Sequence, residues 1–378
     1  MARKTHRPDD MLWTVSAEDI RIASYDDSDY LHHATIDANG DDTNAENRLN
    51  KPNALNTLNS GVAVNNKSDV MDTVALGRLL DTRYPRKSMV KLFDEKLIHI
   101  NEYKAMPHDE VSAGDEIRIA MAKEKLDYEP VPMDLVILYE DDDLLVVDKP
   151  AGMTVNSKGQ VSLANGVAHY FKEHGIKRKV RFLNRLDRDT TGCIIIAKSG
   201  LAQSLYQQQM DSDVFEKWYV ATVEGLIADD SGSLEFPMEK ASDGIHYEVS
   251  PNGKNTRTDF IVLHRCAARA VDNSVNNRKK SVDRVDENVD IAHRDVDKSG
   301  LIVDNVVDNC LPDAYTDVSV RLYTGKTHQI RVAFSHIGHP LVGDTLYGAM
   351  ATGTAFKLRA EKIVFTHMRT GERITVTA

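Results

Sequence analysis

One short run, residues 181–192, constrains this chain more than any other part of its sequence. It reads RFLNRLDRDTTG and leads into an apolar segment that we predict to be a strand, residues 192–198. If the run is extended, Arg185, Asp187 and Asp189 share one face, because side chains alternate along a strand. A carboxylate held beside guanidinium groups stays ionised, as a carboxylate nucleophile requires. From these residues alone, a structural cluster of ion pairs is the commoner explanation.

The size and apolar content of the chain predict a globular protein without membrane segments. The 378 residues are enough for two or three domains. No apolar run reaches the roughly 18 residues of a membrane helix, and no apolar segment follows the basic N-terminus. The three cysteines form no C-x-x-C pair, so we expect reduced thiols and a cytoplasmic location. We expect Cys193 to be a small core residue.

The net charge of −11 argues at first against a nucleic-acid partner, but its distribution does not. Residues 1–72 hold 7 basic and 13 acidic side chains, and residues 267–313 hold 7 and 10, so these two segments supply −6 and −3. By contrast, residues 173–200 hold 7 basic and 3 acidic side chains, and residues 76–104 hold 7 and 4. Local basic segments of this kind are what phosphate recognition needs.

Composition divides the chain into five segments. Residues 1–72 are polar and acidic, and we predict a disordered tail. Residues 74–121 have the pattern of a small folded module, and residues 122–133, with two prolines, that of a linker. Residues 134–378 form the larger domain, interrupted by a low-complexity insertion at 267–313 in which Val-Asp recurs.

The small module is predicted to contain two helices and two strands. Three leucines, Leu76, Leu79 and Leu80, suit one face of a first helix, and Ser88 is the expected cap of a second that runs to Leu97. Strands are expected at 97–101 and 116–119. This part of the sequence resembles the small RNA-binding module named after a small-subunit ribosomal protein. The matching segments are RLLD at 78–81, RKSMVKL at 86–92, IHIN at 98–101 and GDEI at 114–117. The resemblance implies RNA contacts by basic helix residues. The candidates for these contacts are Arg83, Arg86, Lys87 and Lys91. The alternative is that these residues form only a solvated charged face.

The larger domain is predicted to be rich in strands. Two apolar runs around Asp141-Asp142-Asp143 indicate a hairpin, with strands at 136–140 and 144–147. A helix is expected over residues 200–212, after Ser199. Further strands are expected at 192–198, 218–225, 256–263, 318–323 and 362–366.

Five motifs in this domain resemble those of RluA-type pseudouridine synthases, in the order that the family has them. They are VDKPAGM at 147–153, RLDRDTTG at 185–192, KWYVA at 217–221, GKTHQIRV at 325–332 and HIGHPLVGD at 336–344. The resemblance implies an α+β catalytic domain with a mixed, largely antiparallel β-sheet, preceded by the small α/β RNA-binding module. It also implies an isomerase that converts specific uridines in structured RNA to pseudouridine.

The same resemblance assigns roles to single residues. Asp187 matches the nucleophile, Tyr219 the residue that stacks on uracil and assists the late proton transfer, and Arg331 the partner that holds Asp187 ionised. Arg185 matches the side chain that fills the space left by the flipped base. Further RNA contacts are expected from Arg188, Lys149 and His328. Without the resemblance, Tyr219 would be an ordinary strand residue and the arginines would be ion-pair partners.

Several other expectations follow. Isomerisation needs no redox step and no group donor, so we expect no cofactor. The spacing of His328, His336 and His339 matches no helical zinc pair, so we expect no metal. The expected partner is ribosomal RNA, from the large subunit, or transfer RNA; we expect no DNA, no membrane and a monomer.

The chain also departs from the family pattern. Asn184 stands where histidine is usual, Asn156-Ser157 where a His-Pro pair is common, and Arg359 where histidine is usual. These departures bear on the substrate more than on the reaction. The alternatives are a non-catalytic RNA-binding assembly factor and, more weakly, a glycosidase that uses Asp187 and Asp189.

Overall fold

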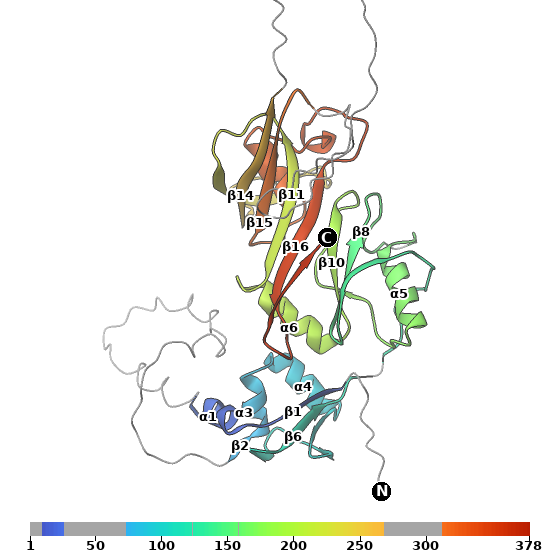
Figure 1. Cartoon of the computed structure of the whole chain (residues 1–378), viewed down its shortest axis with the longest axis vertical. Coiled ribbons are helices and arrows are strands. Elements are labelled where there is room, and N and C mark those ends of the chain that lie inside the picture. Colours follow the sequence, from blue (N-terminus) through green and yellow to red (C-terminus); the bar gives the residue numbers. More distant parts are fainter. Residues whose placement is uncertain (1–9, 26–72, 123, 158, 268–311) are drawn as a thin grey trace, which may run out of the picture. The chain divides into compact units, whose positions relative to one another are not determined.

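The computed structural model describes residues 10–25, 73–122, 124–157, 159–267 and 312–378 (Figure 1). Most of the predicted tail and almost all of the predicted insertion therefore lie outside the described residues. The chain divides into two compact units. The first comprises residues 1–217 and 362–378, and the second comprises residues 218–361. In the part of the chain that the structure describes, no helix is long and apolar enough to cross a membrane.

The small module begins earlier than predicted. Residues 11–14, assigned to a disordered tail, form a strand that pairs with residues 116–119 in an antiparallel ladder. The composition did not predict this strand because Met11 and Val15, 4% and 2% exposed, are buried in a core whose other residues come mostly from residues 74–121. The elements are β1 (Met11–Thr14), α1 (Ala17–Tyr25), β2 (Thr73–Ala75), α3 (Leu76–Asp81), α4 (Arg86–Asp94), β3 (Ile98–Ile100), β4 (Tyr103–Lys104), β5 (Glu110–Ser112) and β6 (Glu116–Ile119).

The two helices of the module differ in how well the sequence predicts them. In α3, Leu76, Leu79 and Leu80 are fully buried, as expected. The predicted start of α4 at Ser88 is wrong: the helix begins at Arg86, after Pro85 in an extended conformation. Proline favours a helix start because its ring fixes φ, and here it precedes the first helical residue.

The predicted linker is an ordered segment bound to the larger domain. Glu124 forms an ion pair with Arg181 and accepts a hydrogen bond from the backbone of Lys179. Asp127 accepts a hydrogen bond of 2.9 Å from the backbone of Val180. The module therefore forms one packed unit with this part of the chain, and Leu201 of helix α6 (Gly200–Met210) joins its core.

The remainder of the first unit is built on a sheet with the order β16-β10-β8-β7, with β17 beside β16 and β9 beside β10. The predicted hairpin is confirmed, since β7 and β8 pair in antiparallel. The helix predicted after Ser199 is α6, and Ser199 caps it by accepting a hydrogen bond from the backbone of Ala202. Strand β10 is buried along almost its whole length. The elements are β7 (Val136–Glu140), β8 (Leu144–Lys149), α5 (Leu163–Glu173), β9 (Arg181–Phe182), β10 (Thr191–Ala197), α6, β16 (Leu358–Thr366) and β17 (Arg373–Thr377).

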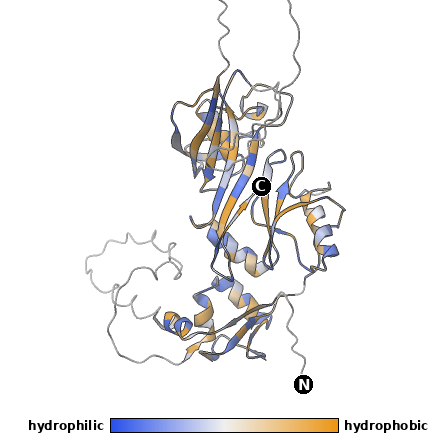
Figure 2. Ribbon diagram, viewed as in Figure 1, coloured by the Kyte–Doolittle hydropathy of each residue, from blue (hydrophilic) through white to orange (hydrophobic). Residues whose placement is uncertain are grey.

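The second unit contains strands in the order β13-β12-β14-β15-β11, each paired with its neighbour in antiparallel. Buried and partly exposed residues alternate along β11 and β15, and Figure 2 shows the corresponding alternation of hydropathy. Helix α7 packs on the buried face, where Phe334 contacts Phe260. The predicted α+β fold with a largely antiparallel sheet is confirmed. The elements are β11 (Glu216–Glu224), β12 (Ser231–Lys240), β13 (Tyr247–Val249), β14 (Lys254–Ala267), β15 (Ala314–Leu322), α7 (Gln329–His336) and the short 3-10 helix η2 (Thr345–Tyr347).

Candidate active site

Asp187 lies in the loop that joins β9 to β10 in the first unit. Two leucines anchor this loop, since Leu183 and Leu186 are 8% and 9% exposed. Asn184 holds it to β10: its side chain donates to the carbonyl of Cys193 at 3.0 Å and accepts from the backbone of Ile195 at 2.9 Å. The departure from the family's usual histidine thus supplies two hydrogen bonds that fix the loop.

The charged side chains of the loop differ in exposure. Arg185 and Arg188 are exposed, whereas Asp187 and Asp189 are half-buried. Arg188 contacts Asp189 at 3.3 Å, and its side chain is 67% exposed. Both arginines are therefore accessible to RNA, and the two carboxylates lie partly withdrawn from solvent.

Lys149 was predicted to contact RNA, but in the structure its side chain is buried and binds backbone carbonyl groups. It is fully buried, and its Nζ donates to the carbonyls of Pro150, Met153 and Arg188 at 2.8, 2.9 and 2.8 Å. These three bonds use all the donors of an ammonium group. Burial lowers the pKa of Lys149 to about 8, while the charges of Asp189 and Asp187 oppose that shift. Lys149 therefore ties the 150–153 turn to the loop that carries Asp187.

In the second unit, Tyr219 lies on β11 opposite Val320 of β15, and it is 7% exposed. Arg331 is on α7 and is 5% exposed. Its Nε and Nη2 donate to the two carboxylate oxygens of Asp344 at 2.7 and 2.8 Å. This bidentate geometry fixes the plane of the guanidinium group.

Aromatic rings complete the surroundings of Arg331. Its Cζ lies 5.0 Å from the ring centroid of Tyr347 and 4.3 Å from that of Phe356. His328 precedes α7 with a φ of 58°, and its Nδ1 lies 2.7 Å from the hydroxyl of Tyr347. Sequence reasoning missed Asp344, Tyr347 and Phe356. The only available signal was that Asp344 ends the last matching motif.

The turn before α7 is held by Gln329, which is 2% exposed. Its side chain accepts from the Thr324 hydroxyl and the Lys326 backbone at 2.9 and 3.0 Å. It also donates to Thr258 of β14 at 3.0 Å. The GKTHQIR motif therefore owes its shape to a buried amide that joins a turn, a helix and a strand.

The predicted RNA contacts of the module fall into two groups. Arg83 forms an ion pair with Asp19 and lies over the ring of Trp13, 5.2 Å from its centroid. Arg86, Lys87 and Lys91 are exposed on α4, and Arg83 is exposed as well. Lys91 has a distant ion pair with Glu95, at 3.8 Å. All four side chains are thus accessible, and Arg83 is held by an ion pair and an aromatic ring.

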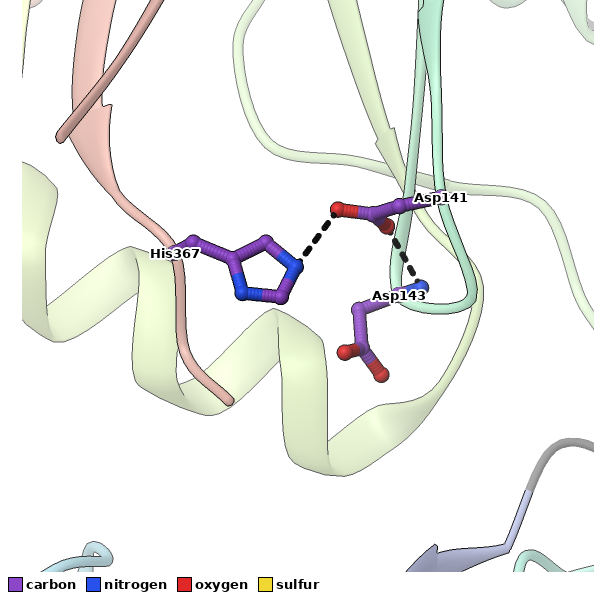
Figure 3. A group of neighbouring side chains, drawn as sticks. All are labelled: Asp141, Asp143 and His367. Atoms are coloured by element: carbon purple, nitrogen blue, oxygen red, sulfur yellow. Dashed lines mark hydrogen bonds and ion pairs between the residues drawn. The ribbon is translucent and has the colours of Figure 1, made fainter. Parts of the chain in front are cut away.

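One acidic cluster has the composition of a metal site. Oxygen and nitrogen atoms of Asp141, Asp143 and His367 lie within 4.8 Å of one another (Figure 3). Each group already has a protein partner. His367 contacts Asp141 at 3.1 Å, and Arg369 binds both oxygens of Asp143 at 2.5 and 2.8 Å. These contacts hold the turn after β16 against the β7–β8 turn and explain the cluster without an ion.

Replacing Arg369 by methionine is expected to lower the free energy of unfolding by about 3–5 kcal/mol. Asp143 is 1% exposed, so the variant leaves a buried carboxylate without its cation. Denaturant unfolding measures the loss. The double variant Asp143→Asn/Arg369→Met should recover part of it, and simple additivity of the two changes would contradict a coupled pair.

Replacing Asp344 by asparagine is expected to lower kcat about 10²-fold, because Arg331 loses the charge that fixes its orientation. Steady-state kinetics on a tritium-labelled RNA substrate measures this, at a temperature where the variant is shown to be folded. The matched control is Asp317→Asn, which removes a half-buried carboxylate of β15 in the same unit. Equal rates for both variants would exclude a role for Asp344 in orienting Arg331.

The comparisons with known proteins agree with the arrangement of motifs. A family model described as RNA pseudouridylate synthase matches residues 143–336. The chain belongs to this family. It is 34% identical over 281 residues to the "Uncharacterized RNA pseudouridine synthase YlyB" of Bacillus subtilis (strain 168), covering 71% of the chain and 77% of that protein.

Two further similarities involve a named ribosomal enzyme and a solved structure. "Ribosomal large subunit pseudouridine synthase D" of Pasteurella multocida (strain Pm70) is 27% identical over 273 residues, which are 70% of this chain and 69% of that one. The structure of "Human RNA Pseudouridylate Synthase Domain Containing 1" has a TM-score of 0.46 and 21% identity, covering 65% of this chain and 83% of its own. The match to the family model and the sequence relatives show that the chain is an RNA-modifying isomerase, as its motifs predicted.

Proposed function

We propose that this pseudouridine synthase modifies specific uridines of large-subunit ribosomal RNA, with Asp187 as nucleophile. The observation that carries the proposal is the RLDRDTTG loop, in which Asp187 is half-buried between two exposed arginines. The ribosomal substrate is supported by the similarity to large-subunit synthases of several bacteria. Transfer RNA is the alternative substrate.

The reaction begins when the target uridine leaves its stack, at a cost of a few kcal/mol. Arg185 fills the space that the base vacates, and Arg188 contacts the neighbouring phosphate. Both side chains suit these roles because they are exposed and positively charged. Arginine offers several fixed donors to phosphate and base edges.

Asp187 then attacks the flipped nucleoside, and the bond between uracil N1 and ribose C1′ breaks. The detached uracil turns so that its C5 bonds to C1′, and the proton on C5 is lost while N1 gains one. Substrate and product are isomers, so no electrons or groups are exchanged with a cofactor. In this scheme Asp187 is released unchanged after each turnover.

Tyr219 and Arg331 are proposed to complete the catalytic set. Tyr219 offers a ring for stacking and a hydroxyl for the late proton transfer. Arg331 is proposed to keep Asp187 ionised and oriented. Its suitability rests on the bidentate pair with Asp344, which holds the guanidinium plane in place. His328 is proposed to contact RNA beside this set.

Tritium release from RNA labelled at uridine C5 tests the proposal, because only formation of the new carbon–carbon bond expels that hydrogen. Wild-type protein should release tritium from unmodified large-subunit ribosomal RNA and not from transfer RNA. Release from transfer RNA alone would reassign the substrate. No release from either, by folded protein that binds RNA, would favour the non-catalytic assembly factor.

A further inference from the structure

Tyr347 lies among contacts of the second unit to which the proposed reaction assigns no role. It is half-buried at the end of η2. The Cζ atom of Arg331 is 5.0 Å from the centroid of its ring, and the ring of His328 meets it edge-on at 5.6 Å. One side chain therefore touches both the proposed catalytic arginine and the histidine that precedes helix α7.

The hydroxyl group of Tyr347 has two hydrogen-bond partners. The backbone N–H of Tyr247, on β13, donates to Oη at 3.1 Å. The second partner is Nδ1 of His328, 2.7 Å from Oη. Because Oη already accepts the hydrogen of Tyr247, its own hydrogen is available to Nδ1, which then accepts it. A neutral imidazole that accepts at Nδ1 carries its hydrogen on Nε2.

His328 has an unusual backbone conformation for a residue at the start of a helix. Its φ of 58° lies in the left-handed region, which is costly for a residue with a Cβ atom. It is the N-cap residue of α7, but its side chain forms no capping hydrogen bond and bonds Tyr347 instead. N-cap side chains usually stabilise the helix that follows. The strained backbone and the uncapped helix indicate that this ring position serves the site more than it serves helix stability.

The partners of His328 are themselves held in place. Ser335 of α7 donates to the backbone carbonyl of Tyr347 at 2.7 Å. The turn before β13 is fixed by Asp243, which accepts from the backbone N–H groups of Ile245 and His246 at 2.8 and 2.9 Å. Both the hydroxyl group that meets Nδ1 and the backbone N–H that donates to this hydroxyl therefore have fixed positions.

We propose that Tyr347 is a positioning residue that locks His328 in its neutral form with the hydrogen on Nε2. Protonation would turn Nδ1 into a donor, and the hydroxyl hydrogen would lose this acceptor. The locked ring offers a donor to an oxygen atom of the substrate, whereas the other tautomer would offer a lone pair that repels it. A donor that is fixed before the substrate binds needs no reorganisation during the reaction. This role in the reaction rests on the proposed function.

Nitrogen NMR of the full chain with isotope-labelled histidine tests the lock, because protonated and unprotonated ring nitrogens have well-separated chemical shifts. Spectra are recorded at about pH 8, above the ordinary histidine pKa of about 6.5. The variant Tyr347→Phe keeps the ring and removes only the hydroxyl group, and His328→Gln identifies the signals of His328. We expect the hydrogen on Nε2 alone in the wild type and a mixture of both tautomers in Tyr347→Phe.

The matched control for this measurement is Tyr323→Phe. It removes another hydroxyl group of the second unit, which donates to Asp259, and it should leave the signals of His328 unchanged. A hydrogen on Nδ1 in the wild type, or the same single tautomer in Tyr347→Phe, would overturn the proposal.

Single-turnover tritium release tests whether Tyr347 acts through His328. We expect Tyr347→Phe to lower the rate about tenfold at saturating RNA, with RNA affinity within about twofold of the wild type. His328→Ala should cost at least as much. The double variant should be no slower than His328→Ala alone, because the two residues act as one unit. If the hydroxyl group had only a structural role, the two losses would multiply, and that result would overturn the proposal.

The two measurements separate this inference from the proposed function, because the NMR signals require neither RNA nor catalysis. A locked His328 without tritium release by the wild type would keep the lock and reject the proposed function. Tritium release by a wild type that shows both tautomers would do the reverse.

Discussion

Replacing Asp187 by asparagine is expected to lower tritium release from uridine-labelled RNA by at least about 10⁴-fold. The amide has nearly the shape of the carboxylate but is not a nucleophile, and loss of a nucleophile typically costs this much or more. RNA affinity should change little, because the exposed Arg185 and Arg188 remain. Single-turnover assays at saturating protein separate the chemical step from binding.

The matched control is Asp189→Asn, two residues further along the same loop. It removes a half-buried carboxylate that contacts Arg188, so charge and exposure are nearly equal in the two variants. We expect a loss of less than about tenfold, which is a modest electrostatic effect. Comparable losses in both variants would indicate a pair of carboxylates acting together. Release by the Asp187 variant at the wild-type rate would show that another residue is the nucleophile.

Replacing Lys149 by methionine is expected to lower both stability and activity. The variant leaves the carbonyls of Pro150, Met153 and Arg188 without their donor, at about 1–3 kcal/mol for each buried group. Removing a buried charge offsets part of that cost, so we expect a net loss of about 2–4 kcal/mol. The Asp187 loop loses its attachment, and kcat should fall about 10²-fold. Denaturant unfolding and tritium release measure the two effects.

The control for this variant is Lys172→Met, which removes an exposed lysine from α5 and should change neither quantity. Wild-type stability in the Lys149 variant would show that the three carbonyls find other donors. Normal kcat with reduced stability would mean that the loop keeps its position without the ammonium group.

The difference in stability between the wild type and the Lys149→Met variant should change with pH in a defined direction. Burial lowers the pKa of Lys149 to about 8 in the folded protein, against an ordinary value of 10.5. Between these values the unfolded chain binds the proton that the folded protein has released. The stability of the wild type relative to Lys149→Met should therefore rise as pH increases from about 8 to about 10.5. Unfolding curves of both proteins across this range measure the difference, and a falling difference would contradict the lowered pKa.

Local sequence patterns predicted the helices and strands whose identity depends on residues close together in the sequence. The strands β8 and β10 follow from short apolar runs, and α6 begins after Ser199, as predicted. Patterns of this kind work because they depend on residues only a few positions apart. The same reasoning located the Asp187 loop, since its charged residues are contiguous in the sequence.

Contacts between distant residues escaped prediction. Strand β1 is a strand because residues 116–119 pair with it, although a long acidic segment separates the two. The linker is ordered because Glu124 and Asp127 meet residues 179–181. In both cases the local composition is that of a mobile segment, and only the partner supplies the stabilising free energy.

The sequence by itself determined the family and the reaction class, because five motifs occur in the order that the family has them, and it predicted the residues that are proposed to carry the reaction. The tertiary structure decided how those residues are held. It assigned Lys149 to three backbone carbonyls and Arg331 to Asp344. The physical reason is that burial and hydrogen bonding depend on which distant segments meet in the folded chain.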